Sequence, residues 1–143
     1  NTSYIGDIDA PKIKLPGSGG APDIATMAER LIIAINHQKH RLVERVDYIT
    51  SPGFLDGGNA RKRLGLPGGG PAAVITDRAI LRPLGPDNEL HLASIHPGHT
   101  LEEVMENTGW ELRSVPDLVE TTPPNKDEMA ALHRIDKEGF WRS

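Results

Sequence analysis

Several absences narrow the classes of protein to which this chain can belong. It has no cysteine, which excludes disulfides and thiolate chemistry and fits a cytoplasmic protein. Its net charge is −4 and it has no long run of Lys or Arg, so it lacks the basic surface typical of nucleic-acid binding. No apolar stretch approaches the roughly 18 residues of a membrane span, and the first ten residues do not resemble a signal peptide. We therefore expect a cytoplasmic protein with no nucleic-acid or membrane partner.

Aromatic residues are also scarce. Trp, Tyr and Phe each occur only twice among 143 residues, so the core has to be built from aliphatic side chains. The 15 glycines and 12 prolines indicate many loops. The length fits one domain or part of one. Because the chain begins at Asn1 and its polar opening leads directly into a strand, we expect residues 1–143 to be the C-terminal portion of a single, longer domain.

The spacing of apolar residues predicts strands and helices that follow one another along the chain. The run LIIAI at residues 31–35 is typical of a strand covered on both faces. Helices are expected at residues 23–30, with Ile24, Met27 and Ala28 on one buried face, and after the capping boxes that begin at Thr100 and Asn125. The other expected elements are one helical turn at 60–64 and strands at 1–6, 12–15, 42–49, 71–77, 79–83, 90–96 and 110–115. This order predicts an α/β or mixed α+β sheet protein.

A glycine-rich turn stands out in the stretch KLPGSGGAPDIA at residues 14–25, between an expected strand and an expected helix. Gly17, Gly19 and Gly20 let the backbone take positive φ and approach a ligand closely. A helix that begins there presents unpaired N–H groups and the positive end of its dipole. The arrangement suits a phosphate, a carboxylate or the oxyanion of an acyl-transfer intermediate. The alternative is a strand-to-helix turn that only needed flexibility.

Two histidine pairs, His37 with His40 and His96 with His99, invite a metal interpretation. Each pair lies in an expected turn without a third ligand at zinc spacing, so we predict solvated turn histidines and no metal site. His96 ends an expected strand before a Pro-Gly turn, which is where α/β folds place ligand-binding groups.

No complete catalytic set is visible. The chain lacks a GxSxG nucleophile elbow, and Ser18 has no base assigned to it by spacing. Glu44 and Asp47 fall on opposite faces of their expected strand and form no carboxylate pair. The basic triplet at 61–63 lies in the long glycine-rich region 50–70, where it either holds a phosphate or is simply solvated.

Several motifs in register resemble one known family. KLPGSGGAPDIA, VERVDYITSPGFLDG, GLPGGGPAAVITDRAIL and SIHPGHTLEEVMENTGWEL resemble the beta (B) subunit of class I coenzyme A transferases, of the glutaconate CoA-transferase type. The resemblance implies a three-layer α/β/α fold of the NagB/RpiA-like kind around a mainly parallel sheet. It also implies a partner alpha (A) subunit, the upstream part of the beta subunit, acyl-CoA and carboxylic acid substrates, and no permanently bound cofactor, since the coenzyme A thioester is a substrate.

The resemblance also implies which residues act. Family members form a glutamyl-CoA thioester on a Glu in a Glu-Asn-Gly motif upstream of the glycine turn, and this chain has no such motif. The family's glycine turn corresponds to Gly17, Ser18, Gly19, Gly20 and Ala21, where it contacts the CoA thioester. The backbone of Gly19 and Gly20 would form the oxyanion hole. The loop Gly68, Gly69 and Gly70 matches a family loop near the mouth of the active site and would support substrate binding.

Two other functions stay open at this point. Some relatives of the fold are hydrolases that open rings of steroid-derived CoA thioesters and lack the transferase glutamate. A non-catalytic CoA-binding or assembly module is the third possibility.

Overall fold

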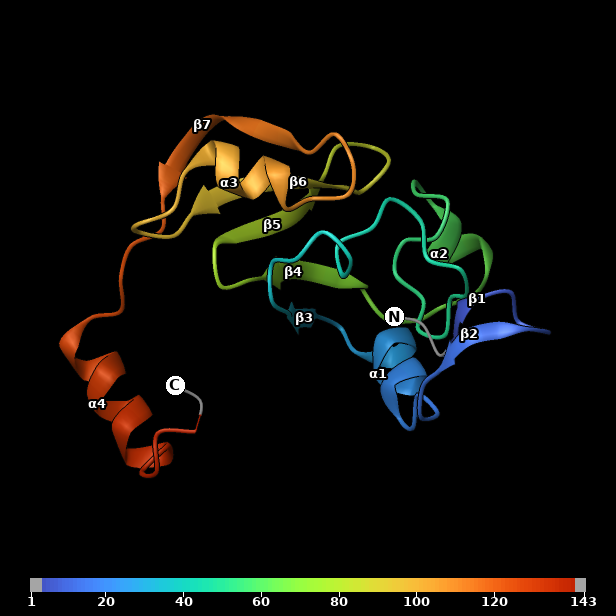
Figure 1. The fold of residues 1–143 in the computed structure, drawn as a ribbon, viewed down its shortest axis with the longest axis horizontal. Helices are drawn as coiled ribbons and strands as arrows, with labels where there is room; N and C mark the ends of the chain where they lie inside the picture. Colours follow the sequence, from blue (N-terminus) through green and yellow to red (C-terminus); the bar gives the residue numbers. More distant parts are fainter. Residues whose placement is uncertain (1–3, 141–143) are drawn as a thin grey trace.

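A five-stranded mixed sheet forms the centre of the computed structural model, which describes residues 4–140. Its order is β3 (Leu31–Ala34), β4 (Pro71–Ile75), β5 (Ala79–Leu84), β6 (Glu89–Ile95) and β7 (Arg113–Glu120) (Figure 1). The α/β class is confirmed. The sheet is less parallel than expected, since β4–β5 and β5–β6 pair antiparallel and only β3–β4 and β6–β7 pair parallel. The connections that join β4 to β5 and β5 to β6 are short turns, which leave no room for a crossover helix.

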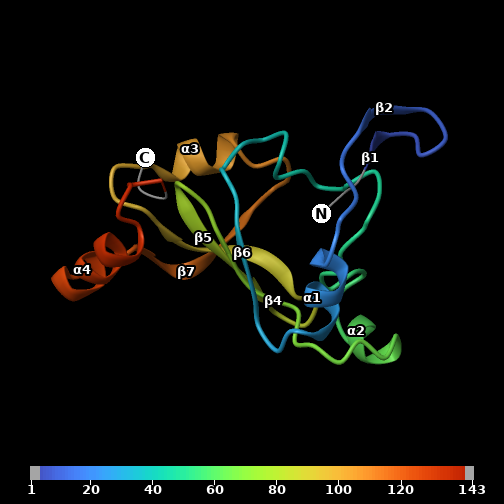
Figure 2. The ribbon, with the colours of Figure 1, turned by 90° about the horizontal axis from the view of Figure 1, so that it is seen from below.

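The core lies between one face of this sheet and the helix α3 (Leu101–Glu106) (Figure 2). Leu81 and Leu92 face each other across β5 and β6 and are fully buried, as is Val104 of α3. The predicted capping box is present, because the Thr100 side chain accepts from the Glu103 amide and the Glu103 carboxylate accepts from the Thr100 amide. This local signal explains why the start of α3 was predictable.

The opposite face of the sheet carries exposed apolar side chains. Side chains alternate between the two faces of a strand, so Ile32, Ile75 and Val119 point away from the core that their neighbours build. Ile32 is 55% exposed and Val119 is 59% exposed. None of the helices of residues 4–140 is long and apolar enough to cross a membrane.

The first part of the described chain forms a separate hairpin followed by a short helix. β1 (Tyr4–Gly6) pairs antiparallel with β2 (Pro11–Lys14), and α1 (Ala21–Met27) follows the glycine turn. The predicted order of strand, glycine turn and helix is confirmed. Residues 1–3 of the expected first strand lie outside the described residues.

The predicted buried face of α1 is wrong. Its single fully buried residue is Ala25, whereas Ile24 is 58% exposed and Met27 is 68% exposed. The helix contacts the rest of the described chain mainly through backbone groups near its C-terminal end, so its larger apolar side chains stay in solvent.

The predicted strand at 42–49 is also wrong. An isolated bridge between Val43 and Gly109 is its only sheet-like pairing within the described residues. Leu42 is the only residue of this segment that is buried, because charged residues interrupt its apolar positions. The expected helical turn in the following region is confirmed as α2 (Ala60–Arg63).

The last two elements are a strand and a helix. β7 begins three residues later than expected, because Trp110 packs against the core rather than starting the strand. The capping box at Asn125 is confirmed and begins α4 (Lys126–Ile135), which lies away from the sheet and has no buried residue (Figure 1).

Candidate functional site

The glycine turn joins β2 to α1 in a conformation that needs glycine at one position. Gly19 has φ of +55°, in the left-handed region that other residues rarely adopt. Gly20 is the N-cap of α1 with φ of −79°. The carbonyl of Ser18 accepts from the Ala21 amide at 3.1 Å, and the carbonyl of Gly20 accepts from the Ile24 amide at 3.0 Å. Hydrogen bonds to its carbonyl groups therefore stabilise the conformation of the turn.

The amide groups of the same turn belong to exposed glycines and lack acceptors within the described chain. Within residues 4–140, the amides of Gly17, Gly19 and Gly20 donate to no acceptor. A Cβ atom built at any of these three positions meets no other atom within 4 Å. Unpaired donors at the start of a helix, with no side chain in front of them, can hold a carboxylate, a phosphate or an oxyanion.

The second glycine loop packs tightly against the C-terminal end of α1. The amides of Gly68 and Gly69 donate to the carbonyls of Thr26 at 2.8 Å and Ala28 at 3.2 Å. A Cβ atom at Gly68 would overlap these same carbonyl oxygens. Two of the loop's amides are thus used inside the protein. Its expected contact with substrate, which includes Gly70, stays a prediction.

The basic triplet divides into one buried and two exposed residues. Arg61 is buried and donates to backbone carbonyls. Lys62 and Arg63 are exposed, and Arg63 pairs with Asp56 at 2.7 Å. The solvated interpretation therefore holds for Lys62 and Arg63, whereas Arg61 is neither solvated nor directed at a ligand.

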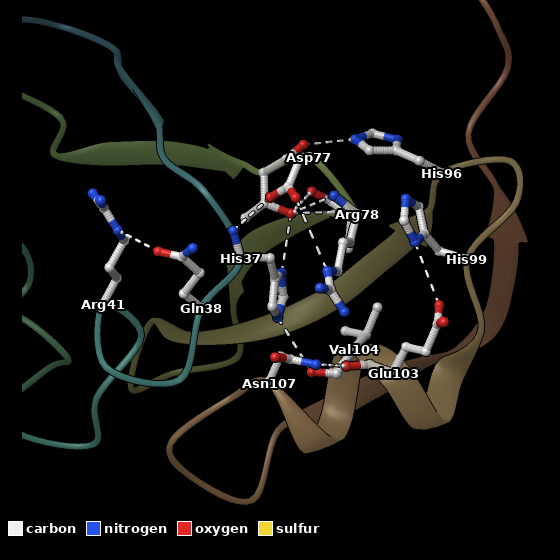
Figure 3. A network of polar contacts seen from close by, with 12 residues as sticks. His37, Gln38, Arg41, Asp77, Arg78, His96, His99, Glu103, Val104 and Asn107 are labelled. Atoms are coloured by element: carbon white, nitrogen blue, oxygen red, sulfur yellow. Dashed lines mark hydrogen bonds and ion pairs between the residues drawn. The ribbon is translucent and has the colours of Figure 1, made fainter.

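His37 is the centre of a buried polar network between β4, β5 and α3 (Figure 3). Its Nδ1 lies 3.0 Å from the Thr76 hydroxyl, and its Nε2 lies 3.0 Å from the Thr108 hydroxyl and 3.2 Å from the Val104 carbonyl. Because that carbonyl oxygen can only accept, we assign the ring proton to Nε2. The predicted solvated state of His37 is wrong, since the ring is fully buried and connects the end of β4 to α3.

The other histidines of the two pairs are less enclosed. His96 lies at the end of β6 with Nε2 3.0 Å from the Thr76 carbonyl oxygen, and His99 lies 3.4 Å from the Glu103 carboxylate. His40 is exposed. Among the described residues, no three His, Asp or Glu side chains come close enough together to hold a metal ion. His96 and His99 thus take part in hydrogen bonds.

Burial lowers the pKa of His37 below its usual 6.5, and the Arg78 charge acts in the same direction, while the bond to the Val104 carbonyl opposes it. The unfolded chain therefore binds more protons than the folded chain just below pH 6.5. We expect the contribution of His37 to the free energy of unfolding to be constant above this pH. Below it, the free energy of unfolding should fall as the pH drops. Urea unfolding between pH 7.5 and 5 measures this slope.

The matched variants are His37→Gln and His40→Gln. We expect His37→Gln to flatten the pH dependence above pH 5, because the lowered pKa values of Glu103 and Asp77 act below 4.5 and 3.8. His40→Gln should keep the slope of the unchanged chain. An equal slope in all three proteins would contradict the assignment of the titration to His37.

One cavity on the described residues is separate from the glycine turn. It has a volume of about 710 Å³, with apolar residues such as Phe54 and Trp110 in its wall. Its charged residues are five carboxylates and one guanidinium, from Glu44, Asp56, Asp87, Glu89, Glu111 and Arg113. This excess of negative charge disfavours the phosphates of a coenzyme A.

The protein is thus of the α/β class, with a strand, a glycine turn and a short helix ahead of its mixed sheet. Comparison with known proteins gives the family. The family described as Coenzyme A transferase matches residues 1–107. The chain belongs to the coenzyme A transferase family, which confirms the resemblance found in its motifs.

Two curated relatives, both B subunits of CoA-transferases, are similar over most of the chain. The chain is 45% identical to the B subunit of the 3-oxoadipate CoA-transferase of Pseudomonas knackmussii, over 95% of this chain and 52% of the relative. It is 43% identical to the B subunit of the glutaconate CoA-transferase of Acidaminococcus fermentans, over 87% of this chain and 47% of the relative. The chain thus spans about half the length of the relatives it matches.

Solved structures agree with this assignment. The crystal structure of glutaconate coenzyme A-transferase from Acidaminococcus fermentans matches with a TM-score of 0.87 and 39% identity, over all of this chain and 55% of that one. Rhodococcus jostii IpdAB matches with a TM-score of 0.81 and 22% identity, over 98% of this chain and 56% of that one. At 22% identity, the match to IpdAB shows a shared fold alone. The fold therefore does not determine which reaction the protein catalyses.

Proposed function

We propose that this chain is part of the B subunit of a CoA-transferase, which moves coenzyme A between an acyl-CoA and a carboxylic acid. The observation that carries the proposal is the pair of amides at Gly19 and Gly20 in front of α1, which are exposed and have no acceptor among residues 4–140. The transferase relatives at 45% and 43% identity support this reaction. The IpdB subunit of the cholesterol ring-cleaving hydrolase of Mycobacterium tuberculosis is 25% identical.

The proposed task of the glycine turn follows from the chemistry of a thioester. Attack on its carbonyl carbon moves negative charge onto the carbonyl oxygen. Fixed N–H donors stabilise this oxyanion, and the loss of one such donor lowers kcat by about 10²–10³. The amides of Gly19 and Gly20 would supply the donors, and Gly17, Ser18 and Ala21 would line the approach of the thioester.

The nucleophile would come from outside this chain. The family resemblance implies a glutamyl-CoA thioester on a Glu in a Glu-Asn-Gly motif, and this sequence has no such motif. We therefore place that Glu in the remainder of the B subunit. We place the enzyme in the cytoplasm, where the absence of cysteine is unremarkable.

The proposed partners are an A subunit and the rest of the B subunit. The two transferase relatives carry the name of a B subunit, which implies a subunit of another kind. The exposed apolar side chains of Ile32, Ile75 and Val119 would be covered by the rest of the B subunit, since the implied three-layer fold needs a second helical layer on that face.

A trapping experiment tests the function. The full B subunit that contains this chain is assembled with its A subunit, incubated with an acyl-CoA and treated with borohydride. We expect a mass change at one glutamate, because borohydride reduces an enzyme-bound thioester. Addition of one water to a ring-containing acyl-CoA, with the thioester retained and no glutamyl adduct, would favour the ring-opening hydrolase. Stabilisation by coenzyme A without turnover would favour the non-catalytic module.

A further inference from the structure

Arg61 is buried among backbone carbonyl groups rather than beside a carboxylate. It is 7% exposed, and the described residues give its guanidinium no acidic partner. Its donors reach carbonyls of three separate segments, two within nine residues of Arg61 in sequence and one about 35 residues before it. They are Gly68 at 3.0 Å from Nε, Gly53 at 2.9 Å and Pro52 at 3.4 Å from Nη1, and Ala25 and Thr26 at 3.0 Å each from Nη2.

The Nη2 contacts satisfy the C-terminal end of α1. The last four carbonyls of a helix lack partners within it, and a positive charge there is favoured by the helix dipole. α1 has no basic residue in its own last turn. Arg61 supplies the missing cation from the separate helix α2, so it acts as a long-range cap for α1.

Few other contacts fix the position of α1. Ala25 is its only buried residue. Next to the Arg61 contacts, the amides of Gly68 and Gly69 bind the carbonyls of Thr26 and Ala28. The helix is therefore anchored at its C-terminal end by Arg61 and by the loop that Arg61 itself binds through Gly68.

We propose that Arg61 is a positioning residue, which fixes α1 and thereby the amides of Gly19 and Gly20 at the other end of the helix. This inference rests on the function proposed for the glycine turn. A helix of seven residues is only about 10 Å long. A shift or tilt at the anchored end is therefore transmitted to the amides at its start, where the rate depends on the exact position of the donors.

Lysine cannot replace this arginine. The guanidinium is planar and carries donors in several directions, so it reaches three segments at the same time. A lysine keeps the charge but has its donors on one nitrogen atom. Arg61→Lys therefore removes the bonds by which one side chain joins α1, the segment around Gly53 and the Gly68 loop, and it leaves the direct bonds from the loop amides to α1 in place. Arg63→Lys is the matched control, since Arg63 lies on the same helix, is exposed and, within residues 4–140, pairs with Asp56 and Asn59 alone.

The test uses the full B subunit assembled with the A subunit. For Arg61→Lys we expect the α1 amides of Ile24 and Ala28 to exchange hydrogen at least tenfold faster, and those of Leu81 and Leu92 within twofold of the unchanged protein. We expect kcat to fall at least tenfold and KM for the acyl-CoA to stay within threefold. Arg63→Lys should change neither exchange nor kcat.

Any of four results would overturn the positioning role. The first is unchanged exchange in α1, and the second is faster α1 exchange with unchanged kcat. The third is an equal rise of exchange in α1 and in the sheet, which would assign Arg61 to general stability. Arg61→Gln is measured in parallel, and failure of both variants to assemble, beside a normal Arg63→Lys, would also assign Arg61 to stability.

The Gly20→Val variant of the same complex distinguishes a failure of this inference from a failure of the proposed function. An unchanged kcat in Gly20→Val would contradict the role of the turn. An unchanged kcat in Arg61→Lys beside an inactive Gly20→Val would contradict only the role of Arg61.

Discussion

Replacement of Gly20 by valine should lower kcat of the assembled enzyme at least 100-fold and change the free energy of unfolding by about 1 kcal/mol at most. Gly20 has φ of −79°, which any residue adopts, and a Cβ atom there meets nothing within 4 Å. The fold therefore tolerates valine. Its methyl groups would occupy the space from which a thioester oxygen reaches the amides. Steady-state kinetics and urea unfolding measure the two effects.

Two alanine variants separate backbone strain from loss of function. Gly19 at +55° and Gly85 at +71° both have positive φ and open space around the missing Cβ. Alanine should lower the free energy of unfolding by about 1 kcal/mol at either position. Only Gly19→Ala should also lower kcat. Equal kinetics for the two variants, or a normal kcat in Gly20→Val, would show that the turn does not contact the substrate.

Gly68→Ala should lower the free energy of unfolding by about 1–3 kcal/mol. The added Cβ would lie 2.5 Å from the carbonyl oxygens of both Thr26 and Ala28, so the loop has to separate from α1. Equilibrium urea unfolding measures the loss.

Gly53→Ala is the control for this prediction. Gly53 lies in the neighbouring segment, has no positive φ, and its new Cβ would meet only a Pro71 side-chain atom at 3.8 Å. We expect a change of less than about 0.5 kcal/mol. Equal stability of Gly68→Ala and Gly53→Ala would contradict the tight packing of the loop on α1.

Local signals predicted the elements whose causes lie within a few residues. The capping boxes at Thr100 and Asn125 and the glycine turn before α1 act over one helical turn, and all three are present. The strand expected at 42–49 shows the limit of this approach. Its apolar residues favour an extended chain, but a strand exists only where a neighbouring strand pairs with it, and here the pairing is one bridge to Gly109.

The two most informative polar residues could not be recognised from the sequence because their partners are distant. Arg61 binds carbonyls at 25 and 26, and His37 contacts Thr76 and Thr108. In the sequence, a basic triplet in a loop and a histidine in a turn are expected to be solvated. Their burial depends on contacts with other segments, which only the fold reveals. The available hint for His37 was its place two residues after the aliphatic run at 31–35, where the chain meets the end of the sheet.

The neighbours in the sheet follow the order of the chain, and this has a consequence for how the protein folds. The three central strands are joined by short turns, so their contacts form between residues that are close in sequence. β3 and β7 join by parallel pairing after much longer connections, whose closure costs more entropy. We expect the central antiparallel meander to form early and the two outer strands to dock onto it later.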